Sequence, residues 1–343
     1  MQWRLARVGS GIGLDMATPS WQLGPTLLRG VAALLLCWST AGIAGTPSTS
    51  ATASTVDTPP GDTSFRCTHL PRNGDEVVTL ETTLAGVPAI LRVPAHVTRP
   101  PIVLWHGFGA PASPHALMEA MPLDDVAAVK VYLGLPLFGT RAPAGGSQEL
   151  ARRQTQDFAM LLFKPAVVGA ADELPSVVAA LEQHGCMTPG QRIDLFGFSA
   201  GGTAALVAMM QGKVAVGAAV LLNASTGLNA SVDAWQRALG QRYPWTPASR
   251  ALAEETDAVA HAADVVRGKT LPAILILQGE GDTVLTTAPA MALHQALLPI
   301  YRRKHDEARL GMIMVPGMPH GWTDDQAAAD GVRRDAGAWF GRY

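Results

Sequence analysis

Short apolar runs recur along most of this chain and are separated by segments with helical periodicity. The runs lie at residues 101–105, 129–133, 192–196, 214–222, 273–277 and 310–315. Runs of this length predict strands that are buried on both faces, as in a parallel sheet. Helical patterns lie at residues 150–163, 166–184, 289–298 and 323–340. The alternation predicts an α/β fold with a mostly parallel central sheet and helices on both faces.

Local signals refine the first part of this pattern. Residues 76–82 and 87–93 are both β-prone, and Ala85-Gly86 lies between them, so a hairpin is expected. Pro114 suits the first turn of a helix that follows the run at 101–105. The helix at 166–184 is expected to begin after Pro165 and to end before Gly185.

The segment at residues 224–269 interrupts the alternation, because it contains no clear strand. It contains Trp235, Tyr243 and Trp245 among short helical patterns. An insertion at this point would lie over the carboxyl ends of the strands, where open α/β sheets bind ligands. We interpret it as a small helical cap over the substrate pocket. The alternative is a helical connection that packs on the flank of the sheet.

The N-terminal region has the pattern of an export signal. Arg29 precedes an apolar run at 31–38 and a group of small residues at 41–45. This order predicts a signal peptide over residues 1–44, with Met16 as a possible start. An uncleaved N-terminal anchor is the alternative. Residues 45–64 are rich in Ser, Thr and Ala and predict a disordered linker before a domain at 65–343. We therefore expect an exported protein, periplasmic or extracellular, with no stable membrane insertion after cleavage.

The balance of charges bears on nucleic-acid binding, and the cysteines bear on the redox state of the compartment. The chain has 26 Lys and Arg against 28 Asp and Glu, a balance that does not favour nucleic-acid binding. Of three cysteines, Cys37 lies in the predicted signal peptide. Cys67 and Cys186 remain, and after export they would either form a disulfide or stay as two buried thiols.

The sequence Gly197-Phe198-Ser199-Ala200-Gly201 carries the first sign of chemistry. It follows one of the apolar runs and opens a helix of small residues, which is the context of a nucleophile elbow. A serine hydroxyl needs a neighbouring base to become a nucleophile. Side chains in place of the two glycines would collide with the neighbouring strand and helix. The alternative is an ordinary strand-to-helix turn in which Ser199 caps the helix.

Over residues 75–343 the chain resembles the α/β-hydrolase superfamily, especially dienelactone-hydrolase-like and prolyl-oligopeptidase-like catalytic domains. That resemblance implies the chain order Ser, acid, His, each after a strand. Asp282 follows the run at 273–277 in the context Gly279-x-x-Asp282-x-Val284 and is the implied acid, with Glu280 as the alternative. His320 follows the last run and is the implied base.

The resemblance also implies the remaining site residues. The backbone N–H groups of Ala200 and Phe108 are expected to form the oxyanion hole, with Gly107 as the alternative to Phe108. His106 is assigned to the substrate site, with a part in orienting its loop, and Trp235 and Trp245 are assigned there from the cap. We expect no cofactor and no metal, because the sequence has neither a ligand cluster at zinc spacing nor a phosphate-binding loop.

These features together predict a serine hydrolase that cleaves small-molecule carboxylic esters through an acyl-enzyme. A peptidase or amidase of the prolyl-oligopeptidase type is one alternative. Only the stretch 67–93 precedes the catalytic strands, so the large propeller of those peptidases is not expected. A non-catalytic binding protein with a hydrolase fold is the other alternative, and the presence of Ser199, Asp282 and His320 argues against it.

Overall fold

A computed structural model describes residues 65–70 and 77–343 of the chain. The predicted signal peptide at 1–44 and the predicted linker at 45–64 both lie outside the described residues. The centre of the domain is an eight-stranded sheet. Its strands are β1 (Val78–Leu84), β2 (Val87–Val93), β3 (Ile102–Trp105), β4 (Lys130–Leu133), β5 (Ile193–Phe198), β6 (Val216–Leu222), β7 (Ala273–Gly279) and β8 (Leu310–Val315).

The strand order is β1-β2-β4-β3-β5-β6-β7-β8. The β1–β2 and β2–β4 pairs are antiparallel, and all other neighbours are parallel. The predicted mostly parallel sheet is therefore confirmed. The carboxyl ends of β3 and of β5 to β8 meet at one edge, so loops from distant parts of the chain converge there.

The predicted hairpin is present at the antiparallel edge. Leu84 pairs with Val87, so Ala85 and Gly86 form a two-residue turn. Both have positive φ, 50° and 82°, as the tight turn of a twisted hairpin requires. Alternate residues of β1 are exposed, since this strand covers the margin of the sheet.

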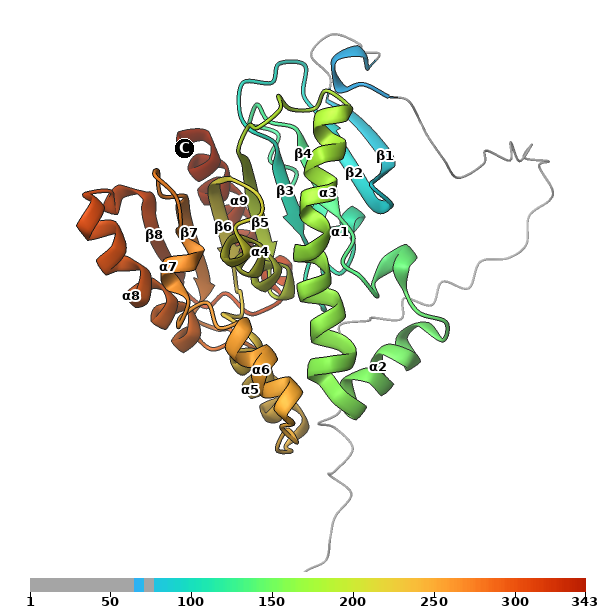
Figure 1. Cartoon of the computed structure of the whole chain (residues 1–343), viewed down its shortest axis with the longest axis vertical. Helices are drawn as coiled ribbons and strands as arrows, with labels where there is room; N and C mark the ends of the chain where they lie inside the picture. The colour runs from blue at the N-terminus through green and yellow to red at the C-terminus, as the bar shows by residue number, and fades with distance from the viewer. Residues whose placement is uncertain (1–64, 71–76) are drawn as a thin grey trace, which may run out of the picture.

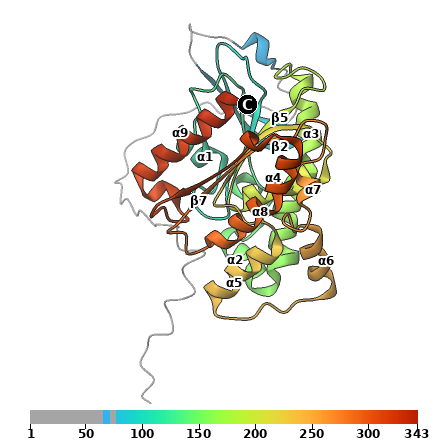
Figure 2. The same ribbon diagram turned by 90° about the vertical axis from the view of Figure 1, so that its left-hand side faces the viewer.

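Helices cover both faces of the sheet (Figures 1 and 2). One face carries α1 (Pro114–Ala120) and α9 (Gln326–Arg342), which pack into one buried apolar cluster. The other carries α3 (Gly169–Gln183), α4 (Ala200–Gln211), α7 (Ala262–Val265) and α8 (Thr287–Lys304), which pack into a second cluster. Short 3-10 helices lie at η1 (Cys67–His69), η2 (Gly139–Arg141), η4 (Glu307–Arg309) and η5 (Trp322–Asp324).

The helical region before β5 differs from the prediction of two helices separated at Pro165. The chain forms α2 (Gly146–Asp157), a π-helix η3 (Phe158–Val168) and then α3. The change of direction falls at Asp157, whose carboxylate accepts a hydrogen bond from the Met160 N–H at 3.1 Å. Pro165 lies inside the π-helix. The wider turn accommodates a residue that has no N–H to donate and would clash in a regular α-helix.

The insertion at 224–269 contains α5 (Leu228–Leu239), α6 (Pro247–Glu255) and α7, and no strand lies among these described residues. Helices α5 and α6 lie beyond the end of the sheet together with α2 (Figure 1). The Trp235 indole N–H donates to the Gln154 carbonyl at 2.9 Å, and the Tyr243 hydroxyl donates to the Asp157 carboxylate. The first part of the insertion therefore contacts α2 and η3, whereas α7 packs on the face of the sheet beside α4 and α8.

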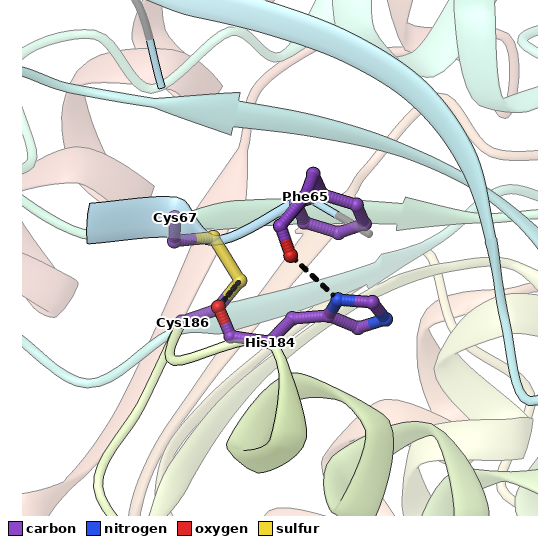
Figure 3. Close-up of a disulfide and its surroundings, with 4 residues drawn as sticks. All are labelled: Phe65, Cys67, His184 and Cys186. Atoms are coloured by element: carbon purple, nitrogen blue, oxygen red, sulfur yellow. Dashed lines mark hydrogen bonds between the residues drawn. A yellow bond between two sulfur atoms is a disulfide. The ribbon is translucent and has the colours of Figure 1, made fainter. Parts of the chain in front are cut away.

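A disulfide between Cys67 and Cys186 joins η1 to the turn that follows α3 (Figure 3). The Cys67 N–H donates to the His184 carbonyl at 3.0 Å, and His184 Nδ1 donates to the Phe65 carbonyl at 2.8 Å. The rings of Phe65 and His184 stack with centroids 4.1 Å apart. Of the two states left open by the sequence, the structure contains the bridge. No helix among the described residues is long and apolar enough to span a membrane.

Candidate active site

Ser199 lies at a sharp turn between β5 and α4. Its φ of 53° and ψ of −118° are unfavourable for a residue with a Cβ. The Ser199 N–H donates to the Leu222 carbonyl at 3.0 Å, and its carbonyl accepts from the Thr203 N–H at 3.2 Å. These bonds on both sides hold the strained backbone in place. The arrangement is that of a nucleophile elbow.

The glycines around Ser199 are required by close backbone contacts. A Cβ on Gly197 would lie 2.4 Å from the Gly201 carbonyl oxygen. A Cβ on Gly201 would lie 2.4 Å from the carbonyl oxygen of Trp105 in β3. Neither position has room for a side chain, because helix α4 begins directly against β5 and its neighbour. The predicted steric reason for the two glycines is confirmed.

The structure brings Ser199, His320 and Asp282 together from three loops. His320 Nε2 lies 3.0 Å from Ser199 Oγ, and His320 Nδ1 lies 2.7 Å from Asp282 Oδ2. A carboxylate only accepts hydrogen bonds, so Nδ1 carries the proton and Nε2 is free to accept from the serine hydroxyl. The Asp282 side chain is fully buried. Glu280, the alternative acid, is exposed and does not join this network.

The second carboxylate oxygen of Asp282 is held by the backbone. Asp282 Oδ1 accepts from the N–H groups of Val284 and Leu285, both at 2.8 Å. Gln278 lies beneath and donates to the Leu285 carbonyl at 3.1 Å. These bonds orient the carboxylate toward His320. The sequence indicated Asp282 but gave no sign of Gln278, which reads there as an ordinary residue at the end of a strand.

Asn223 connects the acid and base loops, and sequence reasoning missed this role. Its Nδ2 donates to the carbonyls of Pro319 at 3.1 Å and His320 at 3.2 Å. Its Oδ1 accepts from the Gly279 N–H at 2.8 Å. Asn223 is fully buried, and its φ of 43° is compatible with asparagine. The available signal was its position, since it is a polar residue directly after β6.

The backbone N–H groups of Ala200 and Phe108 are free to act as donors. Ala200 is the first residue of α4, where an N–H has no partner within the helix. Neither this N–H nor that of Phe108 donates to another of the described residues. Gly107 packs against the elbow, since a Cβ there would lie 3.0 Å from Ser199 Cβ. This proximity puts the turn after β3 beside the nucleophile, as an oxyanion hole requires.

His106 does not reach the pocket, contrary to its assignment among the substrate contacts. Its Nδ1–H donates to the Gly107 carbonyl at 2.7 Å, and its Nε2 accepts from the Leu135 N–H at 3.3 Å. Complete burial lowers the pKa of His106 to about 4, so the ring is neutral. Both ring nitrogens are used to hold the turn, which leaves none for a substrate.

An open cavity of about 270 Å³ leads to the triad. Trp235 lines it, whereas Trp245 does not. Trp245 instead packs against Tyr243, with ring centroids 5.0 Å apart, and lies beneath Arg250. The wall opposite α5 comes from α2 and η3, which sequence reasoning treated as ordinary covering helices. Its residues are Leu150, Gln154, Phe158 and Leu162.

The cavity is mainly apolar, and its described lining contains no charged Asp, Glu, Lys or Arg side chain. Phe108 and Phe138 stack with centroids 5.2 Å apart at one side of it. Among the described lining residues there is no Asp, Glu, Lys or Arg, and His320 is the only titratable side chain. No group of three or more potential metal ligands occurs within the described part of the chain. Ser199 and His320 line the cavity, as do the residues Ala200 and Phe108, whose N–H groups have no partner among the described residues.

Comparison with known proteins places this site in context. The model of the prolyl oligopeptidase family matches residues 166–343, which contain all three triad positions. No curated protein matches the chain in sequence.

Solved structures share the fold at low identity. A Thermus thermophilus protein aligns with a TM-score of 0.55 and 18% identity, over 77% of this chain and 98% of its own. A puromycin-hydrolyzing peptidase of Mycobacterium tuberculosis aligns with a TM-score of 0.55 and 19% identity, over 80% of this chain and 40% of its own. A carboxyl esterase of the fungus Tuber melanosporum aligns with a TM-score of 0.53 and 18% identity, over 78% of this chain and 88% of its own.

Proposed function

This chain belongs to the prolyl oligopeptidase family and is a serine hydrolase with the α/β-hydrolase fold, and on that premise we propose that it cleaves neutral carboxylic esters. Ser199 is the nucleophile, His320 the base and Asp282 the residue that orients the base. The observation that carries the ester proposal is the apolar, uncharged cavity beside the triad.

The mechanism uses the contacts described above. His320 Nε2, 3.0 Å from Ser199 Oγ, takes the hydroxyl proton as the oxygen attacks the ester carbonyl carbon. The Asp282 carboxylate stabilises the imidazolium through the 2.7 Å hydrogen bond to Nδ1. The N–H groups of Ala200 and Phe108 donate to the oxyanion. His320 then returns the proton to the leaving alcohol, and water cleaves the acyl-enzyme by the same groups.

The lack of charged side chains in the described cavity lining favours ester substrates over peptides. A peptide that binds near one of its ends brings an ammonium or a carboxylate group. Burial of such a group is costly unless an opposite charge or several hydrogen bonds compensate it. No Asp, Glu, Lys or Arg side chain lines the described cavity. A neutral acyl or alkyl group gains from burial against Phe158, Leu162 and Trp235 without this cost.

A peptidase or amidase is the second candidate, and the family match favours it. Three phenylalanine derivatives separate the two functions in one assay: the N-acetyl methyl ester, the methyl ester with a free amino group, and the N-acetyl anilide. For an esterase we expect the highest kcat/KM on the N-acetyl ester, and a loss of about tenfold or more on the free amine. Comparable kcat/KM on the N-acetyl ester and the anilide would instead indicate a peptidase or amidase, and preference for the free amine would contradict the argument from the uncharged cavity.

The nucleophile is tested by Ser199→Ala, with Ser231→Ala as its control. We expect turnover of the N-acetyl ester to fall on the order of 10⁶-fold, as when the nucleophile of a triad is removed. Ser231 also lines the cavity but has no contact with the triad, so its variant should retain activity. A fluorophosphonate probe should label wild type and Ser231→Ala but not Ser199→Ala. Labelling of Ser199→Ala would refute the assignment.

Export is also part of this proposal. The disulfide between Cys67 and Cys186 supports it, because such bridges persist in oxidising compartments. Expression of the full chain in a bacterial host should yield a protein in the periplasm or medium, with an N-terminus near residue 45 by mass spectrometry. Recovery of the full-length chain in the cytoplasm would contradict export.

A further inference from the structure

The cavity wall contains one side-chain amide that has no hydrogen-bond partner among the described residues. Gln154 on α2 lines the cavity and is 8% exposed. Its side chain makes no hydrogen bond with any of the described residues, although an amide has two donor hydrogens and an accepting oxygen. Its amide atoms are not among the fully buried unpaired atoms, so they are open to solvent in the cavity. A bound substrate that displaces this solvent must replace its hydrogen bonds or leave the amide unpaired.

The backbone of Gln154 is held in place while its amide remains free. The Trp235 indole N–H donates to the Gln154 carbonyl at 2.9 Å. Trp235 itself is 4% exposed and forms part of the same cavity wall. The hydrogen bond between α5 and α2 thus fixes the backbone of Gln154. The reach of its amide into the cavity is limited accordingly.

The other polar side chains of the cavity do not offer a comparable donor. The Ser225 hydroxyl donates to the Gly227 carbonyl at 2.7 Å, so the Ser231 hydroxyl donates to Ser225 Oγ, also at 2.7 Å. Both serine protons are therefore used. Ser147 and Thr283 are exposed and lie at the mouth. Within the described lining and outside the triad, Gln154 is the buried side chain with free donors.

The surroundings of Gln154 define what it can bind. Leu150, Phe158, Leu162 and Trp235 give the cavity aromatic and aliphatic walls, which suit a ring. The lack of charged lining residues excludes a compensated ionic group. A hydroxyl or carbonyl on a ring satisfies the amide and remains neutral.

We propose that Gln154 determines specificity by hydrogen bonding to a neutral polar substituent on an aryl group beside the scissile ester. This inference rests on the proposed esterase function and adds the chemical class of its substrate. The group bound is an aryl ring with a hydroxyl or carbonyl substituent, carried on the acyl or the alcohol side of the ester.

The test compares wild type with Gln154→Leu, and with Gln156→Leu as the matched control. Leucine is close to glutamine in size and has no hydrogen-bonding group, while Gln156 is an exposed residue of the same helix. The substrates are methyl 3-phenylpropanoate with its three ring-hydroxylated isomers, and 2-phenylethyl acetate with its corresponding isomers. For each enzyme, kcat/KM of a hydroxylated isomer is divided by that of its unsubstituted parent.

We expect wild type and Gln156→Leu to prefer at least one hydroxylated isomer by about tenfold. Gln154→Leu should lose that preference, with kcat/KM reduced more for the preferred isomer than for the parent ester. Its melting temperature should stay close to that of wild type, because the amide makes no hydrogen bond with another of the described residues. A structural role of the amide would instead lower the melting temperature and reduce activity on parent and isomers alike.

The remaining outcomes distinguish a failure of the role of Gln154 from a failure of the proposed esterase function. An unchanged preference in Gln154→Leu, no preference in wild type, or a variant that fails to fold would overturn the role of Gln154 while leaving the esterase intact. Failure of wild type to hydrolyse any of these esters would overturn the proposed function itself.

Discussion

At the scale of single residues, the site depends on side chains that hold other side chains. Asp282 orients His320, and Gln278 holds the loop that carries Asp282. Asn223 bonds to both the end of β7 and the loop of His320. None of these three side chains lines the cavity, but they hold the loop that sets the distance between His320 and Ser199.

Replacement of Asn223 by Ala should lower kcat more than it changes KM. The variant loses the bonds to the Pro319 and His320 carbonyls and to the Gly279 N–H. We expect kcat to fall about 10- to 100-fold, because a small displacement of a catalytic group is costly. Steady-state kinetics on one ester measure both constants.

Asn229→Ala is the control. Asn223 and Asn229 both begin an Asn-Ala-Ser sequence, but Asn229 is exposed on α5. It should behave as wild type. Equal kcat values for the two variants would show that Asn223 does not position the base loop.

At the scale of elements, the cavity is formed by two helical segments from different parts of the chain. Helix α5 of the insertion contributes Ala234 and Trp235, and α2 with η3 contributes the facing wall. The hydroxyl of Tyr243 and the indole of Trp235 join the two segments at Asp157 and Gln154. Helix α5 of the insertion therefore forms one wall of the cavity, and α2 with η3 forms the wall that faces it.

The two tryptophans assigned to the substrate site should differ in effect. Trp235→Leu removes a cavity wall and the hydrogen bond to Gln154, so kcat/KM for an aryl ester should fall about tenfold. Trp245→Leu alters a side chain that does not line the cavity, and should stay within about twofold of wild type. A larger loss for Trp245→Leu, measured on the same ester, would contradict the cavity described here.

The disulfide should contribute to stability and not to catalysis. It joins residues 119 positions apart, and it lies at the end of the sheet opposite α2, α5 and α6 (Figure 1). The variant Cys67→Ala/Cys186→Ala should lose about 2–4 kcal/mol of unfolding free energy in urea denaturation, through the larger entropy of its unfolded chain. Its kcat at low temperature should equal that of wild type, and a loss of kcat without loss of stability would link the bridge to the site.

At the scale of the whole molecule, folding buries ionisable groups that the proposed mechanism does not use. Asp194 in β5 is 2% exposed, and its Oδ1 accepts from the Ala218 N–H at 2.7 Å. Burial raises the pKa of Asp194 to about 7, although Arg99, Arg309 and this hydrogen bond oppose the shift. The folded state therefore binds this proton more tightly than the unfolded state.

The contribution of Asp194 to stability should consequently decrease as the pH rises. It is fully present below the unfolded pKa, near 4, and is lost as the pH passes through the folded value of about 7. The free energy of unfolding of wild type, minus that of Asp194→Asn, should fall by a few kcal/mol between pH 4 and pH 7. The subtraction removes the opposite contribution of His106, which has a lowered pKa. A pH-independent difference in urea denaturation would show that Asp194 is ionised in the folded protein throughout.

The sequence by itself determined the strands, their alternation with helices, and the three positions that meet as Ser199, His320 and Asp282. Hydrophobic periodicity reports how buried each residue is, and the chain order of the family then identifies loops at one edge of a parallel sheet. Only the tertiary structure decided that Trp235 and Gln154 line the cavity while Trp245 and His106 do not, and that Asn223 holds the loop of His320. These roles depend on partners about 80 to 100 positions away, such as Trp235 for Gln154 and His320 for Asn223, and a local pattern carries no information about such contacts.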